Sequence, residues 1–294
     1  MLKLVGPLTD PTSHGGKAED AFDVVIPSMA GYGFSGKPAT PGWDCPRMAR
    51  AWAALMKRLG YTQFVAQGGD WGAIVTEQLA AQAPPELLGI HTNMPAAVPI
   101  ELLEKIHLGE PAPDLADDER RAFDRLASLF ANGLSYAQQM ANHPRSLYGI
   151  ADSPAGLAGW FLDNDLWGPD FVERVFEGQS EGLTPDDLLD NISLTWLTKT
   201  ALSGARLYRE NKLPFFAPIG IHIPVAVSAF PDEIYQCPQS WAEKAYPRLI
   251  HYNRPAEGGH FAPWEQPALF AEELRAGLRP LRAERRKSLQ EEAA

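Results

Sequence analysis

An aspartate follows a short apolar run in a setting that predicts a nucleophile. Residues 64–72 read Phe-Val-Ala-Gln-Gly-Gly-Asp-Trp-Gly, so Asp70 lies between glycines at 68 and 72. Such glycines are typical of a sharp strand-to-helix turn, because only minimal side chains let strand and helix pass closely. A carboxylate nucleophile needs no base to activate it, and it attacks an electrophilic sp³ carbon to form an alkyl ester. The simpler alternative for Asp70 is a helix N-cap, a position that Asp favours.

Two later segments supply a histidine and an acid for the same chemistry. His260 lies in the turn 258–261 (Gly-Gly-His-Phe), and we expect it to be the general base for water that attacks the ester. Residues 230–233 (Phe-Pro-Asp-Glu) offer two acids to orient it, of which we favour Glu233 over Asp232. A surface-loop histidine and a pair of loop carboxylates are the alternatives. The order nucleophile, acid, histidine is that of an α/β-hydrolase triad.

Opening a strained ring on such a nucleophile would also require a donor for the developing alkoxide. Tyrosine suits this role because its hydroxyl is weakly acidic. Three tyrosines lie in the helical middle of the chain, Tyr136, Tyr148 and Tyr208. Their spacing does not select among them, and most tyrosines simply pack with the hydroxyl at the surface.

The elements around these residues alternate between strand and helix. The apolar runs predict strands at 22–27, 64–67, 88–94, 222–228 and 249–253. Helical spacing, prolines and glycines predict helices that begin near Pro46 and end at Gly60, and that cover about 71–83 and 266–279. This alternation predicts an α/β fold with a mostly parallel sheet flanked by helices.

The middle of the chain has a different texture. Between about 97 and 215 the strand-like runs disappear and helical stretches carry large apolar side chains such as Phe123, Phe130 and Trp160. We therefore expect a core formed by residues 1–96 and 216–284, an inserted helical cap at 97–215, and a tail at 285–294.

Composition excludes several other classes of function. The net charge of −11 over 294 residues opposes a nucleic-acid surface, and the basic run 282–287 is explained as a solvated helix end. Cys45 and Cys237 are too few for a disulfide framework, and no Cys/His spacing indicates zinc. No apolar stretch approaches the ~20 residues that span a bilayer. We expect a cytoplasmic protein without metal or cofactor, and leave open a homo-oligomer.

Two glycine motifs are set aside. Residues 31–36 (Gly-Tyr-Gly-Phe-Ser-Gly) match the dinucleotide-binding pattern, but prolines and glycine prolong the loop to about residue 44. No helix N-terminus would then face a pyrophosphate. His14-Gly15-Gly16 is similar to an oxyanion loop but does not follow a strand.

Several segments together resemble the epoxide hydrolases of the microsomal and juvenile-hormone type and their bacterial relatives. They span nearly the whole chain in the family's order: residues 21–37 (AFDVVIPSMAGYGFSGK), 68–72, 152–158 (DSPAGLA), 206–211 (RLYREN), 230–233 and 258–261. The resemblance implies Asp70 as nucleophile, His260 as base, Glu233 as its acid, and Tyr136 and Tyr208 as the donating pair. It also implies that the backbone N–H of Trp71 is one oxyanion donor. The expected partners are a small lipophilic epoxide and water.

The chain departs from the family's pattern at two places. Ala30 replaces a proline before the Gly-Tyr-Gly-Phe-Ser segment. Moreover, the family's first strands and its His-Gly-x-Pro loop do not precede Met1. We therefore expect an N-terminally truncated form, as a misplaced start codon would produce. The missing strand would lie between 22–27 and 64–67, where unpaired central backbone groups cost ~1–3 kcal/mol each.

Two other functions compete with epoxide hydrolysis. A haloalkane dehalogenase uses the same Asp-His-acid chemistry, and Trp71 could serve as its halide donor, although RLYREN and DSPAGLA oppose this interpretation. The other alternative is an inactive, truncated hydrolase. A serine esterase is not favoured, because Asp70 stands at the elbow position where such an enzyme carries its serine.

Overall fold

The computed structural model describes residues 1–163, 171–179 and 182–292, and for 284–292 the backbone alone. The chain divides into two compact units. Unit 1 comprises residues 1–25, 49–126 and 215–294, and unit 2 comprises residues 26–48 and 127–214. Each unit has its own packing and is described by itself.

Unit 1 is built on a parallel sheet of four strands in the order β1-β2-β3-β4. The strands are β1 (Phe64–Gly68), β2 (Leu87–Thr92), β3 (Val225–Ser228) and β4 (Leu249–Asn253). Every residue of β3 is buried, as expected for the centre of a parallel sheet with both faces covered. The α/β fold predicted from the alternation of elements is confirmed.

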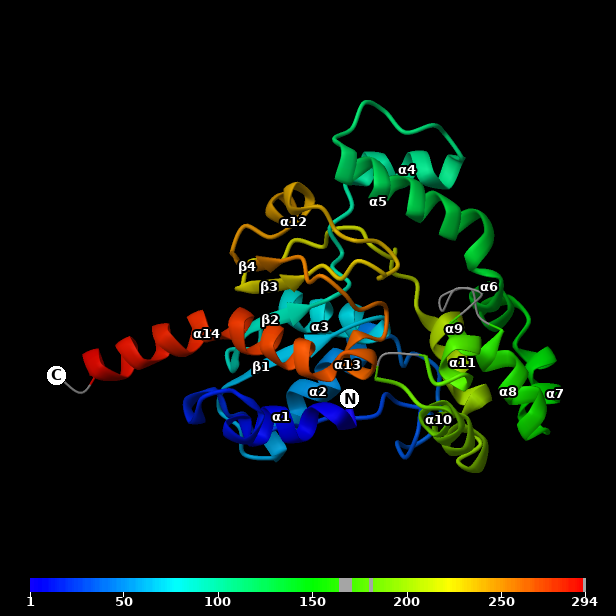
Figure 1. The fold of residues 1–294 in the computed structure, drawn as a ribbon, viewed down its shortest axis with the longest axis horizontal. Coiled ribbons are helices and arrows are strands. Elements are labelled where there is room, and N and C mark those ends of the chain that lie inside the picture. Colours follow the sequence, from blue (N-terminus) through cyan, green and yellow to red (C-terminus); the bar gives the residue numbers. More distant parts are fainter. Residues whose placement is uncertain (164–170, 180–181, 293–294) are drawn as a thin grey trace. The chain divides into compact units, whose positions relative to one another are not determined.

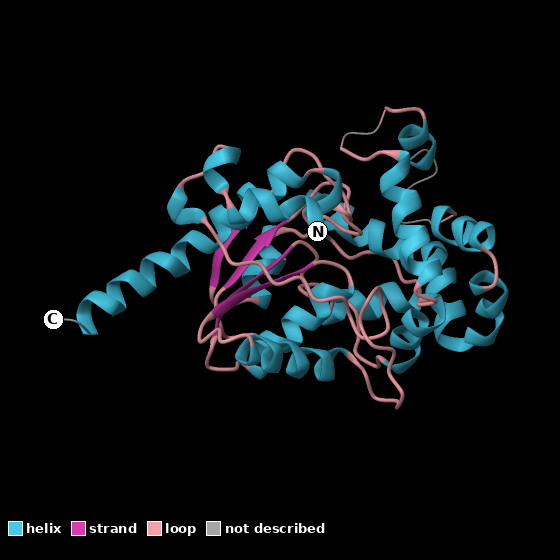
Figure 2. Ribbon diagram, turned by 90° about the horizontal axis from the view of Figure 1, so that it is seen from below, coloured by secondary structure: helices cyan, strands magenta, loops and turns pink. Residues whose placement is uncertain are grey.

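Helices cover both faces of this sheet, as Figure 2 shows. The helix α3 (Trp71–Gln82) packs on β1 and β2, whereas α14 (Pro267–Glu292) contacts β2, β3 and β4. The interface with α14 contains Phe270, Ala271, Leu274 and Leu278, all buried. The remaining elements of unit 1 are η1 (Leu2–Leu4), α1 (Val5–Thr9), η2 (Pro11–His14), η3 (Ala18–Asp20), α2 (Cys45–Arg58, which begins in unit 2), α4 (Ile100–Leu108), α5 (Asp117–Ser128, which ends in unit 2), α12 (Gln239–Ala245) and α13 (Ala262–Glu265).

The regular secondary structure of unit 2 is helical within its described residues (Figure 1). The absence of strands there agrees with the texture of the sequence. Its elements are the π-helical turn η4 (Leu129–Gly133), α6 (Ser135–Asn142), η5 (Pro144–Leu147), α7 (Tyr148–Ala151), α8 (Pro154–Leu162), α9 (Phe171–Phe176), α10 (Pro185–Leu197) and α11 (Ala201–Glu210).

Hydrogen bonds join the loop 26–48 to α11 inside unit 2. The Tyr32 hydroxyl donates to the Gly204 carbonyl at 2.9 Å, and Glu210 accepts from the backbone N–H groups of Gly42 and Trp43. Arg206 donates to the carbonyls of Pro38 and Thr40. No helix begins at the Gly-x-Gly-x-x-G motif, and the loop continues to α2, as the prolines and glycine predicted.

The strand predicted at 22–27 is wrong. This segment forms no ladder. Its one backbone hydrogen bond runs from the Phe22 N–H to the Leu8 carbonyl. Among the described residues the sheet ends at β1, and no backbone hydrogen bond joins 22–27 to that strand, so the segment has no ladder partner.

The last helix is longer than predicted. It continues past Pro280 because the residues that follow the proline pack against unit 1. Leu281 is buried in the core, and Arg282 donates to the carbonyls of Glu19, Asp20 and Ala21. Proline removes one N–H from a helix, and here the packing outweighs that loss. The predicted tail 285–294 is helical as far as 292, and residues 293–294 lie outside the described residues.

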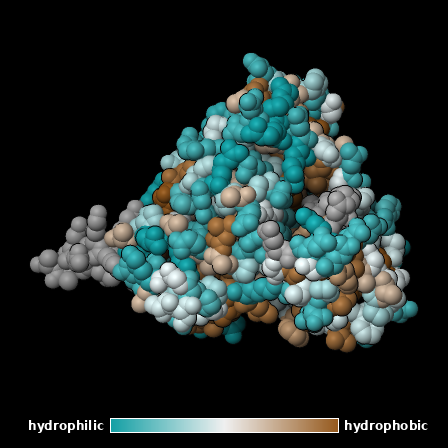
Figure 3. Space-filling view, viewed as in Figure 1, coloured by the Kyte–Doolittle hydropathy of each residue, from teal (hydrophilic) through white to brown (hydrophobic). Residues whose placement is uncertain are grey.

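The surface of unit 1 over α5 is hydrophilic. Helix α5 buries Ala122, Phe123 and Leu126 and begins with three acidic residues at 117–119. Teal side chains cover the part of Figure 3 where α4 and α5 lie. Within the described part of the chain, no helix combines the length and apolar character needed to cross a bilayer.

Candidate active site

The turn that carries Asp70 is tight and strained. Asp70 has φ 52° and ψ −131°, a positive φ that non-glycine residues rarely adopt and that costs of order 1–3 kcal/mol. At Gly68 an added Cβ would lie 2.0 Å from the Gly72 carbonyl oxygen, so glycine is required there. At Gly72 an added Cβ would meet nothing within 4 Å, so the size argument made for that position is wrong.

Asp70 is also the N-cap of α3, so the two interpretations of this residue coincide. Its Oδ1 accepts a hydrogen bond from the Trp71 N–H, and its Oδ2 lies 2.8 Å from Nε2 of His260. The side chain of Asp70 is 38% exposed, whereas that of His260 is 2% exposed. The carboxylate is therefore open to a small molecule while its partner is enclosed.

Glu233, and not Asp232, faces the histidine. Glu233 is completely buried, and its Oε1 lies 2.5 Å from Nδ1 of His260 and accepts from the Ile234 N–H at 2.8 Å. Asp232 is exposed and its backbone N–H donates to the Gly258 carbonyl. The structure thus brings Asp70, His260 and Glu233 into one chain of contacts.

Two residues that the sequence analysis missed support this chain. Glu265, at the end of α13, accepts from the Gly259 N–H at 2.9 Å and from the Phe261 N–H at 3.0 Å, so it holds the turn on both sides of His260. Asn93, directly after β2, donates to Oε2 of Glu233 at 2.9 Å. A polar residue just past the carboxyl end of a parallel strand was the available signal for Asn93, because such ends converge on one edge of the sheet.

The charges of the three groups reinforce one another. Burial favours neutral imidazole, but the carboxylates of Glu233 and Asp70 outweigh it and raise the pKa of His260 well above its ordinary value. Burial likewise opposes ionisation of Asp70, but the hydrogen bond and charge of His260 lower the pKa of Asp70. Both shifts favour an ion pair between the His260 imidazolium and the Asp70 carboxylate.

The predicted tyrosines lie in unit 2 and are close to each other. Tyr136, in α6, and Tyr208, in α11, pack edge to face with ring centroids 5.9 Å apart. Tyr148, the alternative that spacing left open, is 67% exposed. The motif that contains Tyr208 also contains Arg206, which binds the loop 26–48 and Glu210.

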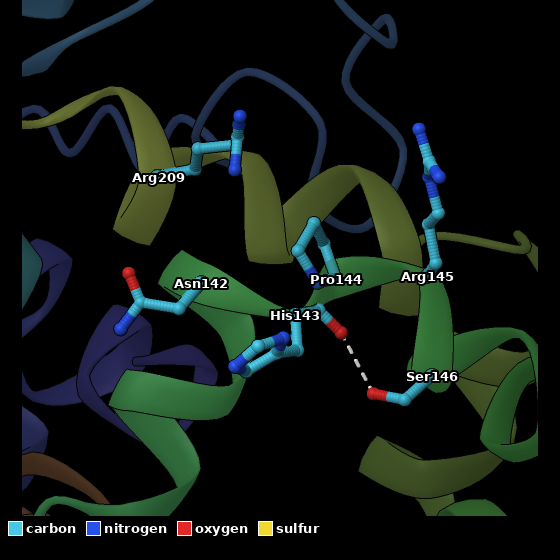
Figure 4. A pocket seen from close by; sticks show the side chains of 6 residues that line it. All are labelled: Asn142, His143, Pro144, Arg145, Ser146 and Arg209. Atoms are coloured by element: carbon cyan, nitrogen blue, oxygen red, sulfur yellow. Dashed lines mark hydrogen bonds between the residues drawn. The ribbon is translucent and has the colours of Figure 1, made fainter.

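Unit 2 also has a surface hollow of about 610 Å³ (Figure 4). It is lined by residues of α6, η5 and α11: Asn142, His143, Pro144, Arg145, Ser146 and Arg209. The lining includes none of the predicted site residues, and its side chains are mostly exposed. Among the residues that the structure describes, no group of His, Cys, Asp and Glu side chains could hold a metal ion.

Comparison with known proteins first defines the fold. Residues 16–143 match the family described as alpha/beta hydrolase fold. The crystal structure of juvenile hormone epoxide hydrolase from the silkworm Bombyx mori superposes with a TM-score of 0.75 at 30% identity, covering 88% of this chain and 64% of that one. The chain therefore has the alpha/beta hydrolase fold.

The sequence relatives define the group within that fold. The chain is 48% identical over 285 residues to the "Putative epoxide hydrolase" of Stigmatella aurantiaca, covering 96% of this chain and 62% of that protein. It is 34% identical to epoxide hydrolase 1 of Oryctolagus cuniculus, covering 93% and 64%. The chain spans less than two thirds of the length of these relatives. It is a homologue of the epoxide hydrolases, as its motifs indicated.

Proposed function

We propose that this protein hydrolyses small lipophilic epoxides to vicinal diols through an ester on Asp70. The observation that carries the proposal is the placement of His260 between the half-exposed carboxylate of Asp70 and the buried carboxylate of Glu233. The names of the relatives support the same reaction class. The RLYREN and DSPAGLA segments oppose the halide-releasing alternative.

The first step is alkylation of Asp70. Oδ2 attacks one ring carbon, the C–O bond of the oxirane breaks, and its electron pair goes to the ring oxygen. Tyr136 and Tyr208 donate hydrogen bonds to that oxygen, and one of them gives up its proton. Two adjacent donors suit this role because they stabilise the charge where it develops.

The second step is hydrolysis of the ester. Water attacks Cγ of Asp70 while His260 takes its proton, and the negative charge on Oδ1 is stabilised by the Trp71 N–H. Collapse releases the diol alkoxide, which takes back the proton that His260 removed from the water. The carboxylic acid left on Asp70 then gives its proton to His260. The tyrosinate left by the first step regains its proton from the His260 imidazolium before hydrolysis begins, so the cycle closes. Glu233 keeps Nδ1 of His260 protonated, so that Nε2 is the basic atom.

The carboxylates next to His260 determine when this residue can act as a base in the second step. Alkylation removes the negative charge of Asp70, one of the two carboxylates that raise the pKa of His260. The pKa of His260 therefore falls when the ester forms, and the imidazolium releases its proton just when a base is needed. We expect the rate of ester hydrolysis to rise with pH until His260 in the ester is fully neutral, and then to level off.

The test is trapping of the ester. His260→Gln is mixed with a styrene-oxide-like epoxide, and the intact mass and a peptide map are recorded. We expect a stable adduct on the peptide containing Asp70 in His260→Gln, diol from the parent, and neither from Asp70→Asn. A folded parent protein that forms neither adduct nor diol would refute the proposal, and halide release from a chloroalkane would replace it with the dehalogenase alternative.

A further inference from the structure

We propose that Asn93 is a positioning residue of the ester-hydrolysis step, and that Gly69 lacks a side chain in order to make room for it. The proposal rests on the function proposed above and deepens it. Asn93 fixes the carboxylate of Glu233 so that one oxygen faces His260, and Gly69 is the matching small residue beside the nucleophile.

Asn93 is held in one orientation from both sides. The side chain is enclosed, with the residue 1% exposed, and its Oδ1 accepts from Nε2 of Gln67 at 3.1 Å. Its Nδ2 donates to Oε2 of Glu233 at 2.9 Å. Because Gln67 occupies the amide oxygen, the amide NH₂ is the group that meets the carboxylate.

The two oxygens of Glu233 then have separate tasks. Oε1 contacts Nδ1 of His260 and the Ile234 N–H, whereas Oε2 bonds Asn93. Glu233 is 0% exposed, so water would not readily replace a lost donor. Without Asn93, Oε2 would be a buried acceptor without its partner and the carboxyl group would be free to turn away from His260.

The absence of a side chain at Gly69 leaves room for the amide group of Asn93. An added Cβ at Gly69 would lie 2.7 Å from Oδ1 and 2.8 Å from Nδ2 of Asn93. The register of the sheet explains the approach, because Gly68 pairs with Thr92 and each chain then continues by one residue. The residue before the nucleophile and the residue after β2 are therefore matched in size.

The position of Asn93 predicts which step it serves. It contacts Glu233, and through Glu233 it acts on His260, which is the base of the second step alone. Asn93→Ala should therefore slow ester hydrolysis on the order of 10- to 100-fold, the loss expected for one hydrogen bond to a buried charge. Alkylation should proceed at the parent rate, so the ester should accumulate during turnover.

The experiment measures both steps separately, by rapid mixing with a styrene-oxide-like epoxide and quenched intact-mass analysis. Asn253→Ala is the matched control, because Asn253 also donates to a buried carboxylate, Oε1 of Glu273, at 2.7 Å. The control should leave both steps unchanged. In Asn93→Asp a carboxylate would replace the NH₂ donor beside Glu233, and the pH profile of hydrolysis should shift. Equal slowing of both steps by Asn93→Ala, or no slowing of hydrolysis, would overturn the proposal.

A size test and a spectroscopic test complete the design. Gly69→Ala should slow hydrolysis in the parent but add little in the Asn93→Ala background, where the space is vacant; simple additivity would contradict the pairing. The NMR resonance of the His260 Nδ1 proton, assigned by its loss in His260→Gln, should shift in Asn93→Ala and not in Asn253→Ala. This resonance requires no turnover, so it tests the positioning of His260 even if the proposed reaction fails.

Discussion

Two clusters of histidine and carboxylate lie in unit 1, and they use the same residue types in opposite ways. The elbow cluster consists of Asp70, His260 and Glu233. The helix cluster consists of His91 from β2, Ser228 from β3 and Glu273 from α14, and it lies between the sheet and that helix. The helix cluster contains serine, histidine and acid, the three residue types of a serine hydrolase.

The direction of the hydrogen bonds separates the helix cluster from such a site. The Ser228 hydroxyl donates to Oε2 of Glu273 at 2.6 Å, and Nε2 of His91 lies 2.9 Å from the same hydroxyl. With the serine proton given to the acid, His91 is the donor to Ser228 and not its base. Both residues are fully buried, so no substrate reaches them.

The two histidines also differ in charge, since the surroundings of His260 favour the cation and those of His91 favour the neutral ring. His260 contacts a carboxylate at each nitrogen, and its pKa is raised. Burial lowers the pKa of His91 to about 3, and His251 lowers it further, whereas the charge of Glu273, beyond the Ser228 hydroxyl, only partly opposes them. Residue types therefore predict little until the partners at each ring nitrogen and the access of solvent are known.

The largest contrast should be in turnover. His260→Gln should slow diol formation about 10³-fold, since it removes the general base, whereas His91→Gln should leave turnover of the folded protein unchanged. Steady-state assays of both variants, corrected for folded fraction by near-ultraviolet circular dichroism, make the comparison. A comparable loss of activity in His91→Gln would show that the helix cluster takes part in catalysis.

Acid sensitivity should depend on His91. Between its unfolded pKa near 6.5 and its folded pKa of about 3, the unfolded state binds one more proton, so stability falls as pH falls. From pH 6.5 to 4.5 the parent should lose about 2 kcal/mol of unfolding free energy through this group. Urea titrations at both pH values should show a smaller loss in His91→Gln; equal losses would contradict the neutral, buried state of His91.

A third buried acid, which has no histidine beside it, sharpens the contrast. Glu77 accepts from the Tyr246 hydroxyl and the Ala96 N–H, and burial raises its pKa to about 7. The folded state then holds the extra proton, so stability falls as pH rises from 4.5 to 7. The parent should lose about 2 kcal/mol between pH 5 and 7. Glu77→Gln should remove this dependence in the same titrations, and a parent with flat stability over this range would refute it.

The smallest effect is expected at Ser228. Ser228→Ala removes the hydroxyl between His91 and Glu273, at a cost of about 1–2 kcal/mol in unfolding free energy. Turnover should not change, because this serine is not a nucleophile. Thermal melts and a parallel activity assay test both parts, and loss of activity without loss of stability would reverse the interpretation of the cluster.

The sequence was most informative where local pattern decides the structure. The runs at 64–68 and 249–253, the turn at Asp70, and the glycines beside His260 all depend on near neighbours in the chain. The choice of Glu233 over Asp232 also agrees with the geometry. The domain boundaries and the roles of the site residues remain predictions.

Features that depend on distant partners could not be predicted. The apolar run 22–27 has strand character, yet a strand also requires a neighbour with free backbone groups. Pro280 ends most helices, but the burial of Leu281 carries α14 past it. Asn93 acquires its importance only when β1 and β2 pair and place it against Gly69 and Glu233.

The measurement that tests the central claim most directly is a single turnover in H₂¹⁸O, with parent enzyme in excess over epoxide. If Asp70 attacks the ring, the oxygen added to the diol comes from its carboxylate, and ¹⁸O enters the peptide containing Asp70. We therefore expect unlabelled diol and a labelled Asp70 peptide after the first turnover. Diol labelled with ¹⁸O, together with an unlabelled peptide, would mean that water attacks the epoxide directly and would contradict the account.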